Sequence, residues 1–321
     1  MLSAMQHNRR VFLRTAGVIA GGAWALRYAP AGLLDAVGAQ APTADAMRAQ
    51  LGAAPIQTTK LGEQLMMLSG PGGNVVVLHG PGGKVVVDGF VQPAWGRLKT
   101  ALDALDDRPI KSLIDTHWHF DHTDNNANFR GAGAGIIAHE NTRTRLMQPH
   151  DLLGMHFDPS PSAALPTQTF PAKLTLQLNG EVLELSHVAP AHTDSDIFVH
   201  YTKADVLHMG DLFFNGFYPF IDASTGGNID GMIVGTAQAL KMTGAKTKIV
   251  PGHGPLGSRP SLEAYHHMLT SIRDRVATGK KAGKTLEQVQ AAKPSAEFDE
   301  MWGKGRVPPD AFVELVYRTL K

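Results

Sequence analysis

The densest group of side chains that can do chemistry lies at residues 117–122, His-Trp-His-Phe-Asp-His. Three histidines and one carboxylate within six residues offer the nitrogen and oxygen atoms that metal ions bind in proteins. Burying so many titratable groups without a metal is costly, which argues against a purely structural hydrogen-bond network. The segment therefore predicts a metal site.

The spacing within residues 117–122 indicates more than one ion. In an extended chain alternate side chains share a side, so His117, His119 and Asp121 would converge while the aromatic residues between them pack the other way. A single metal rarely takes four neighbouring ligands. We therefore expect two ions side by side, with Asp121 and His122 directed at the second.

Three later residues are further candidate ligands, and each stands at the end of an expected strand beside small residues. They are His192 in Ala-His-Thr, Asp211 in Gly-Asp-Leu and His253 in Gly-His-Gly. Loops at sheet ends bring groups from distant parts of the chain together on a rigid frame. Each residue alone has an ordinary structural explanation, but together with residues 117–122 they become predicted ligands.

The composition narrows the classes of function. The 321 residues include 15 His and no Cys, which excludes disulfides, thiolate metal ligands and a cysteine nucleophile. With 30 Lys+Arg against 29 Asp+Glu the net charge is +1, and no basic cluster is interleaved with aromatic residues, so nucleic acid is not an expected partner. Gly-x-Ser-x-Gly is absent, so a serine-hydrolase mechanism is not expected either.

The first 39 residues have the pattern of an export signal. Arg9 and Arg10 precede Phe-Leu and a weakly apolar stretch at 15–26, and small residues at 37–39 offer a cleavage point. The apolar stretch is short for a bilayer span, so we expect no stable membrane anchor. The pattern resembles a twin-arginine signal, which implies the export machinery as partner of the precursor and a periplasmic or secreted location.

The rest of the chain is expected to form a linker and one catalytic domain. Residues 40–56 are rich in Ala, Gln and Pro and predict a linker or a loosely attached first helix, so the domain would cover residues 57–321. Runs of β-branched residues at 74–79 and 84–88, joined by Gly-Pro-Gly-Gly, predict a hairpin.

Further elements follow from the periodicity of apolar residues. A helix is expected at 92–105 and a strand at 110–115. Later strands are expected at 136–138, 174–178, 182–187, 197–200, 206–208 and 247–250, and helices at 229–240, 262–276 and 311–320. Groups of strands separated by amphipathic helices predict an α/β layered domain in which helices cover sheets.

The four motifs, His-x-His-x-Asp-His, Ala-His-Thr, Gly-Asp-Leu and Gly-His-Gly in this order, resemble those of the metallo-β-lactamase superfamily. The resemblance runs from residue 61 to about residue 259, and it implies a four-layer αβ/βα sandwich with a dinuclear zinc site at one sheet edge. By position it implies that His117, His119 and His192 bind the first zinc and that Asp121, His122 and His253 bind the second. It also implies that Asp211 bridges both ions and that Asp88 orients the ligating histidines without binding the metal.

The resemblance also implies the chemistry of a glyoxalase-like hydrolase acting on a small molecule. A hydroxide held between two Zn²⁺ ions attacks an ester, thioester or lactone-type carbonyl, while Asp121 acts as the catalytic carboxylate that orients the hydroxide or carries its proton. Aromatic residues after Asp211 are candidates for an apolar substrate pocket, namely Phe214, Phe217 and Tyr218.

Three alternatives remain. A true β-lactamase resembles the chain at residues 117–122, but such enzymes usually have Cys or Ser in place of Asp211 and a Lys or Ser soon after it to hold the substrate carboxylate. Residues 212–218 contain no cation. An iron-dependent oxidoreductase on the same fold is less favoured, because diiron relatives carry a His-x-Glu pattern that residues 117–119 lack. A non-catalytic metal module is disfavoured by seven candidate ligands, since structural zinc is closed by four.

Overall fold

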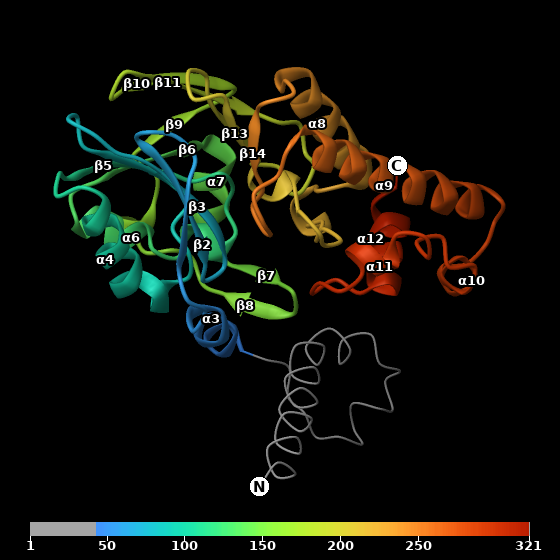
Figure 1. The fold of residues 1–321 in the computed structure, drawn as a ribbon. Helices are drawn as coiled ribbons and strands as arrows, with labels where there is room; N and C mark the ends of the chain where they lie inside the picture. Colours follow the sequence, from blue (N-terminus) through green and yellow to red (C-terminus); the bar gives the residue numbers. More distant parts are fainter. Residues whose placement is uncertain (1–42, 321) are drawn as a thin grey trace, which may run out of the picture.

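The computed structural model describes residues 43–320, and the predicted export signal lies outside them. Two β-sheets face each other, and helices cover their outer surfaces (Figure 1). One sheet has the strand order β1-β2-β3-β4-β5-β6-β9 and the other β10-β11-β12-β13-β14. This architecture is the predicted four-layer αβ/βα sandwich.

The seven-stranded sheet contains the predicted hairpin. Its strands are β1 (Gln57–Lys60), β2 (Leu65–Gly70), β3 (Gly73–Leu78), β4 (Lys84–Val87), β5 (Ile110–Ile114), β6 (Gly135–His139) and β9 (Gln168–Phe170). Strands β3 and β4 pair antiparallel as predicted, and β4, β5, β6 and β9 are parallel to one another. The carboxyl ends of β4 and β5 therefore lie at the same edge of the sheet.

The five-stranded sheet contains the strands predicted in the second half of the chain. They are β10 (Lys173–Leu178), β11 (Glu181–His187), β12 (Ile197–Tyr201), β13 (Val206–His208) and β14 (Lys248–Val250). Strands β13 and β14 run parallel, so the chain leaves both at one edge.

Helices form the outer layers (Figure 1). The seven-stranded sheet is covered by α4 (Trp95–Leu105), which follows the 3-10 turn η1 (Gln92–Ala94), and by α6 (Asn126–Gly131); the other sheet is covered by α8 (Ile229–Met242), α9 (Arg259–Lys281) and α12 (Pro309–Thr319). Shorter elements are α5 (Phe120–Thr123), α7 (Glu140–Leu146), α10 (Leu286–Ala291), α11 (Asp299–Trp302), the hairpin β7 (His150–Leu152) and β8 (Met155–Phe157), and the 3-10 turns η2 (Ser162–Ala164), η3 (Gly210–Leu212) and η4 (Ala223–Thr225). None of the helices within residues 43–320 has the length and apolar composition that a membrane span requires.

The alternation of side chains along each strand explains the layers. In β3, Val76 faces the space between the sheets, whereas Val75 and Val77 belong to the core that includes α4. In β12, Val199 faces the same space between the sheets and Phe198 packs with the helices on the other side. Strands β3, β4 and β12 are buried on both faces and therefore have few polar residues, whereas the edge strand β10 alternates between exposed and partly buried residues.

Residues Ala44–Gly52, within the segment predicted as a linker or loosely attached helix, form helix α3. Thr43 caps it, since its Oγ1 accepts a hydrogen bond of 3.2 Å from the backbone N–H of Ala46. Arg48 donates to both carboxylate oxygens of Asp124, at 2.7 and 2.9 Å, and Leu51 is buried. Helix α3 is thereby attached directly beside α5.

The position of the core between the sheets can be tested with two valines that differ in burial. Replacing Val199, which is fully buried, with Ala should lower the free energy of unfolding by about 2 kcal/mol, because it removes buried methyl groups and leaves a cavity. Val234→Ala on the outside of α8, where the side chain is 58% exposed, is the matched control and should change it by less than about 0.5 kcal/mol. Urea denaturation measures both changes, and an equal loss in the free energy of unfolding for the two variants would contradict this packing.

Candidate metal centre

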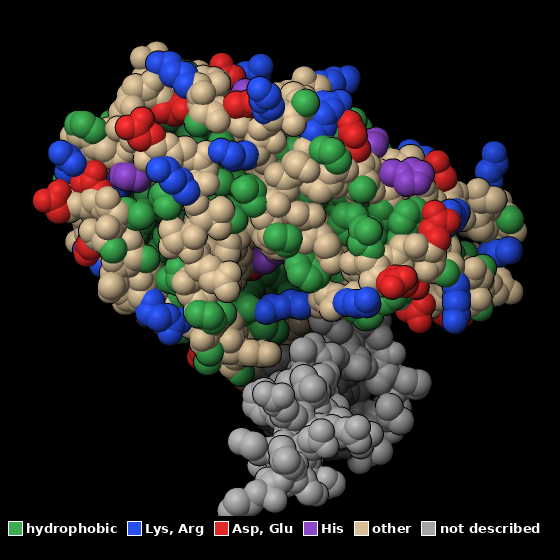
Figure 2. Space-filling view, in the orientation of Figure 1, with side chains coloured by type: hydrophobic (Ala, Val, Ile, Leu, Met, Phe, Trp, Pro, Cys, Tyr) green, Lys and Arg blue, Asp and Glu red, His purple; other side chains and the backbone are tan. Residues whose placement is uncertain are grey.

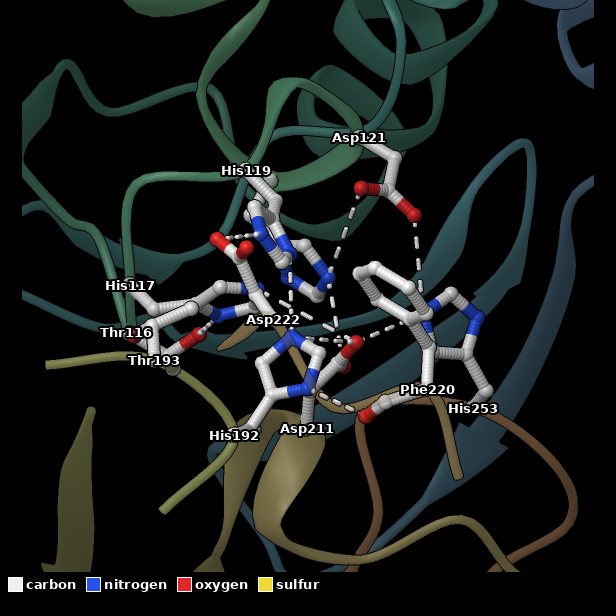
Figure 3. A network of polar contacts seen from close by, with 12 residues as sticks. Thr116, His117, His119, Asp121, His192, Thr193, Asp211, Phe220, Asp222 and His253 are labelled. Atoms are coloured by element: carbon white, nitrogen blue, oxygen red, sulfur yellow. Dashed lines mark hydrogen bonds and ion pairs between the residues drawn. The ribbon is translucent and has the colours of Figure 1, made fainter. Parts of the chain in front are cut away.

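All seven predicted ligands meet at one edge of the two sheets (Figure 3). His117 and His119 follow β5, Asp121 and His122 lie in α5, His192 lies between β11 and β12, Asp211 lies in η3 after β13, and His253 follows β14. Parallel strand ends thus bring together residues that are up to 136 positions apart.

The ligand atoms form two groups, and within each group they lie within 4.8 Å of one another. The first group is His117, His119, His192 and Asp211, and the second is Asp121, His122 and His253. Asp211 reaches both groups, because its Oδ2 lies 3.4 Å from Nε2 of His192 and 3.2 Å from Nε2 of His253. The structure therefore divides the residues as two neighbouring ions would require.

The path of residues 117–122 differs from the predicted extended segment. The backbone is extended at His119, but Phe120–Thr123 form a helical turn. This turn directs Asp121 toward His253 and away from the first group, so the alternation argument was wrong for Asp121. Trp118 packs in an apolar cluster that includes Phe157, as expected. Phe120 belongs to the same cluster but also lines the cavity over the site, so the expectation was wrong for this residue.

The outer ring nitrogens of four histidines are held by neighbouring groups. His117 Nδ1 lies 3.1 Å from Thr116 Oγ1, His119 Nε2 lies 3.3 Å from Asp222 Oδ2, His122 Nδ1 lies 2.8 Å from Asp88 Oδ2, and His192 Nδ1 lies 2.8 Å from the carbonyl oxygen of Phe220. Such contacts fix the tautomer and orientation of a ring, so that its other nitrogen presents a lone pair to the centre.

Within residues 43–320, three of the inner atoms lack hydrogen-bond partners, whereas His119 Nδ1 and His192 Nε2 lie 2.9 Å apart and contact each other. Among the described residues, His117 Nε2, His122 Nε2 and Asp211 Oδ1 are buried and make no hydrogen bond. A buried polar atom left unpaired costs about 1–3 kcal/mol. A cation at the centre would satisfy all three atoms, and imidazole nitrogen with carboxylate oxygen is a donor set that Zn²⁺ accepts. The residues present therefore fit divalent metal ions.

The charge states of the cluster agree with this fit. Burial lowers the pKa of His192 to about 4 and lowers the pKa of His117 well below its usual value, so both rings are neutral near pH 7 with lone pairs available. Burial raises the pKa of Asp211, but the charges of His253 and His122 outweigh burial and hold this pKa well below its usual value. Burial lowers the pKa of His122, but the charges of Asp88 and Asp211 outweigh burial and raise it well above its usual value, so a metal ion at this ring would take the place of its proton.

Asp88, predicted to support the ligands, lies behind His122 at the end of β4. Its Oδ1 accepts a hydrogen bond of 2.8 Å from the backbone N–H of Thr116, and its Oδ2 accepts one of 2.9 Å from the hydroxyl of the same residue. The backbone of Asp88 has φ of +65°, which is uncommon for a residue with a side chain. These hydrogen bonds hold the residue in that strained conformation beside the site.

Asp222 was missed by the sequence analysis, although it supports His119 in the way that Asp88 supports His122. Its carboxylate accepts hydrogen bonds from the hydroxyls of Ser224 at 2.5 Å and Thr225 at 2.6 Å. Burial raises the pKa of Asp222, but its hydrogen bond with His119 and the two hydroxyls outweigh burial and lower it. The run Asp-Ala-Ser-Thr indicates only a turn, and nothing in the sequence links it to a histidine 103 residues earlier.

A cavity of about 350 Å³ opens over the two groups. Its lining includes His119, Asp121, His192, Asp211 and His253, the predicted pocket residues Phe214, Phe217 and Tyr218, and further apolar side chains of Leu152, Leu153 and Phe220. Phe214 stacks on His253 with ring centroids 5.1 Å apart, so the apolar wall begins directly at the second group. The hydroxyl of Tyr218 donates to Asp299 at 2.8 Å. Because this polar end is paired with Asp299, we assign Tyr218 to the wall of the cavity and not to its reactive groups.

Two cations also line the cavity, and the sequence analysis missed them. Residues 212–218 contain none, but Lys304 and Arg306 reach the cavity from the loop between α11 and α12. Figure 2 shows histidine atoms inside a hollow on this face, with Lys and Arg side chains along its rim. Only the tertiary fold brings this loop over ligands that precede it by more than 50 residues in sequence.

The fold and the site together define a sandwich of two sheets with a metal centre at one edge. A family model described as the metallo-beta-lactamase superfamily matches residues 68–266, more than half of the chain. The protein belongs to the metallo-β-lactamase superfamily, whose members are mostly metal-dependent hydrolases.

Solved structures show the same fold. A metallo-beta-lactamase from Pontibacter korlensis is 18% identical with a TM-score of 0.58, and the alignment covers 67% of this chain and 99% of that one. The DIM-1 metallo-beta-lactamase is 18% identical with a TM-score of 0.57, and the alignment covers 68% of this chain and 98% of that one. The BLEG-1 B3 metallo-beta-lactamase is 21% identical with a TM-score of 0.54, and the alignment covers 67% of this chain and 100% of that one. At these identities the likeness concerns the fold alone. No curated protein sequence matched the chain significantly.

The support that Asp222 gives to His119 can be tested by Asp222→Asn. This change keeps the size of the side chain but removes its charge, and we expect the affinity for Zn²⁺ to fall by about 10-fold or more. The measurement is competition with a chromophoric chelator. Asp158→Asn, at a side chain that is 94% exposed, is the matched control and should leave the affinity unchanged. Equal affinities in the two variants would show that Asp222 does not tune the site.

Proposed function

We propose that the protein binds two zinc ions and hydrolyses an ester, thioester or lactone-type carbonyl of a small molecule. The observation that carries this proposal is the position of the unpaired inner atoms. They belong to two groups of nitrogen and oxygen donors that lie beneath one largely apolar cavity. A structural zinc site would be closed by four ligands and would not open into a cavity.

The donors divide naturally between the two ions. His117, His119 and His192 would hold the first, Asp121, His122 and His253 the second, and Asp211 both. Ions bound there would supply an activated water nucleophile and a Lewis acid for the carbonyl oxygen. The described residues then have to position the substrate, exclude bulk water and handle protons.

Asp121 is suited to carry a proton. Its side chain is 15% exposed and lines the cavity, whereas the side chain of Asp211 is only 5% exposed. One oxygen of Asp121 lies 3.9 Å from His122 Nε2 and the other 3.5 Å from His253 Nε2, both longer than a hydrogen bond. The carboxylate, which would also hold the second ion, can take a proton from the attacking water and return it to the leaving group.

The aromatic residues after Asp211 would bind the apolar part of the substrate. Phe214 and Phe217 come from the chain directly after η3, and Leu152 and Leu153 of the β7–β8 hairpin line the same cavity. Apolar walls of this kind bury the body of a small molecule and exclude water from the reacting carbonyl. This favours substrates with an alkyl or aryl acyl group.

A β-lactamase activity remains the second candidate, because the cavity does contain cations. Residues 212–218, which follow Asp211, contain no cation that could hold the carboxylate of a β-lactam. Lys304 and Arg306 fill that gap from another part of the chain. β-Lactams therefore belong in the substrate panel beside p-nitrophenyl esters, thioesters and lactones.

Hydrolysis can be tested with this panel and two ligand variants. We expect the zinc-loaded protein to cleave at least one ester, thioester or lactone. We expect His119→Ala and Asp211→Ala to lose bound zinc and to lower kcat/KM by at least about 100-fold, because each removes a ligand from a metal that activates water. His156→Ala, at an exposed histidine outside the cavity, is the matched control. A folded, metal-free variant with unchanged activity would contradict the proposal.

We also propose export through the twin-arginine route, supported by the order of paired arginines, apolar stretch and small residues in the first 39 positions. Replacing Arg9 and Arg10 together with lysine should keep the precursor in the cytoplasm, since the route reads the arginine pair. Arg27→Lys, beyond the apolar stretch, is the control. Immunoblots of periplasmic and cytoplasmic fractions measure where each variant accumulates. Periplasmic accumulation of the double variant would refute this route.

A further inference from the structure

The two cations of the cavity come from a part of the chain that the family match does not include. The match ends at residue 266, and Lys304 and Arg306 lie within the 55 residues that follow. These residues include α10, α11 and α12, and the loop 303–306 between the last two lies against the cavity. The loop is therefore a feature of this chain and not part of the matched family region.

The loop is held firmly against the aromatic wall. Trp302 before it and Val307 after it are both buried, and the backbone N–H of Tyr218 donates to the carbonyl of Trp302 at 2.9 Å. Gly305 lies so close to Phe217 that a Cβ atom there would stand 2.8 Å from the ring. Only glycine permits this approach, which fixes the cations on either side of it relative to the cavity.

Neither cation has an acidic partner within hydrogen-bond or ion-pair distance among the described residues. The hydrogen bond that the Arg306 guanidinium makes within residues 43–320 runs from Nη1 to Sδ of Met47 in helix α3, at 3.9 Å. Partial desolvation lowers the pKa of Arg306, and the charge of Asp121 opposes this. Asp121, however, belongs to the second group of metal donors, so an ion there would compete for its charge.

An unpaired guanidinium at an apolar cavity is suited to bind an anion. Arginine presents planar donors that match a carboxylate, and a lysine two residues away adds a second positive charge. Both cations line the same cavity as His119, Asp121 and His253 but stand on a different element. A molecule whose carbonyl reaches the metal donors can thus place another group beside the loop.

We infer that Arg306, assisted by Lys304, binds a carboxylate of the substrate, and that the preferred substrates are apolar esters or related carbonyl compounds carrying this carboxylate away from the scissile bond. This inference rests on the proposed hydrolase function. Arg306 is then a specificity-determining residue, and the carboxylate fixes the orientation of the acyl group in the cavity.

The test compares two esters that differ in one charge. The mono-p-nitrophenyl ester of glutaric acid is anionic, and p-nitrophenyl valerate has the same acyl chain length without the charge. In the zinc-loaded protein, Arg306→Ala and Lys304→Ala should each lower kcat/KM for the anionic ester by about 10-fold, mainly through KM, and leave the neutral ester within about twofold. Arg306→Lys should retain part of the preference, and Lys281→Ala, at an exposed lysine near the end of α9, is the control.

A binding measurement separates this inference from the proposed function. Calorimetry with 4-phenylbutyrate should show binding to the zinc-loaded protein that weakens about 10-fold in Arg306→Ala and with rising ionic strength, whereas 4-phenylbutanol should bind both proteins equally. If the wild type hydrolyses no ester but still binds 4-phenylbutyrate more tightly than Arg306→Ala does, the proposed hydrolase function is wrong and the role of Arg306 in binding a carboxylate stands. Equal losses on both esters, or equal binding of 4-phenylbutyrate to wild type and variant, would overturn the role of Arg306.

Discussion

The site depends on one buried carboxylate, Asp211, surrounded by imidazole rings, four of which have their outer nitrogens engaged by neighbouring groups. Burial of an ionised group without compensation is costly, so its charge has to be balanced at short range. His122, His192 and His253 lie within 3.4 Å of its oxygens. Since three inner atoms, His117 Nε2, His122 Nε2 and Asp211 Oδ1, lack hydrogen-bond partners among the described residues, a metal centre is an arrangement that satisfies them together.

The sandwich provides the frame for this cluster. Asp88 and Thr116 follow adjacent parallel strands and bond to each other beneath His122. On the second sheet, a Cβ atom at Gly252 would overlap Asp211 Oδ1, so the glycine before His253 lets this loop pass close to η3. The glycines before Asp211 and His253 are therefore a packing requirement, since a Cβ atom at Gly210 would stand 2.9 Å from Thr116.

The sequence predicts well those features that depend on local pattern. The periodicity of apolar residues predicts a layered α/β domain and all five strands of the second sheet, but not β1, β2 and β9 of the first sheet, and the four-layer sandwich follows only from the resemblance to the superfamily. Residues 117–122 predict a metal site because their donors are neighbours in the chain. The helical turn at Asp121 was not foreseen, since four residues carry too little periodicity to separate a turn from an extended segment. Asp222 and Arg306 were missed because their roles arise only from tertiary contacts, with His119 and with the cavity, respectively.

The central claim is that these residues form a dinuclear zinc centre. Elemental analysis of the protein, purified without added metal and without chelators, measures the ions that it holds, with protein concentration determined by amino-acid analysis. A dinuclear centre requires about two zinc per chain. One iron per chain, with oxygen uptake that depends on a thiol substrate, would instead indicate an oxidoreductase on the same fold and would contradict the account.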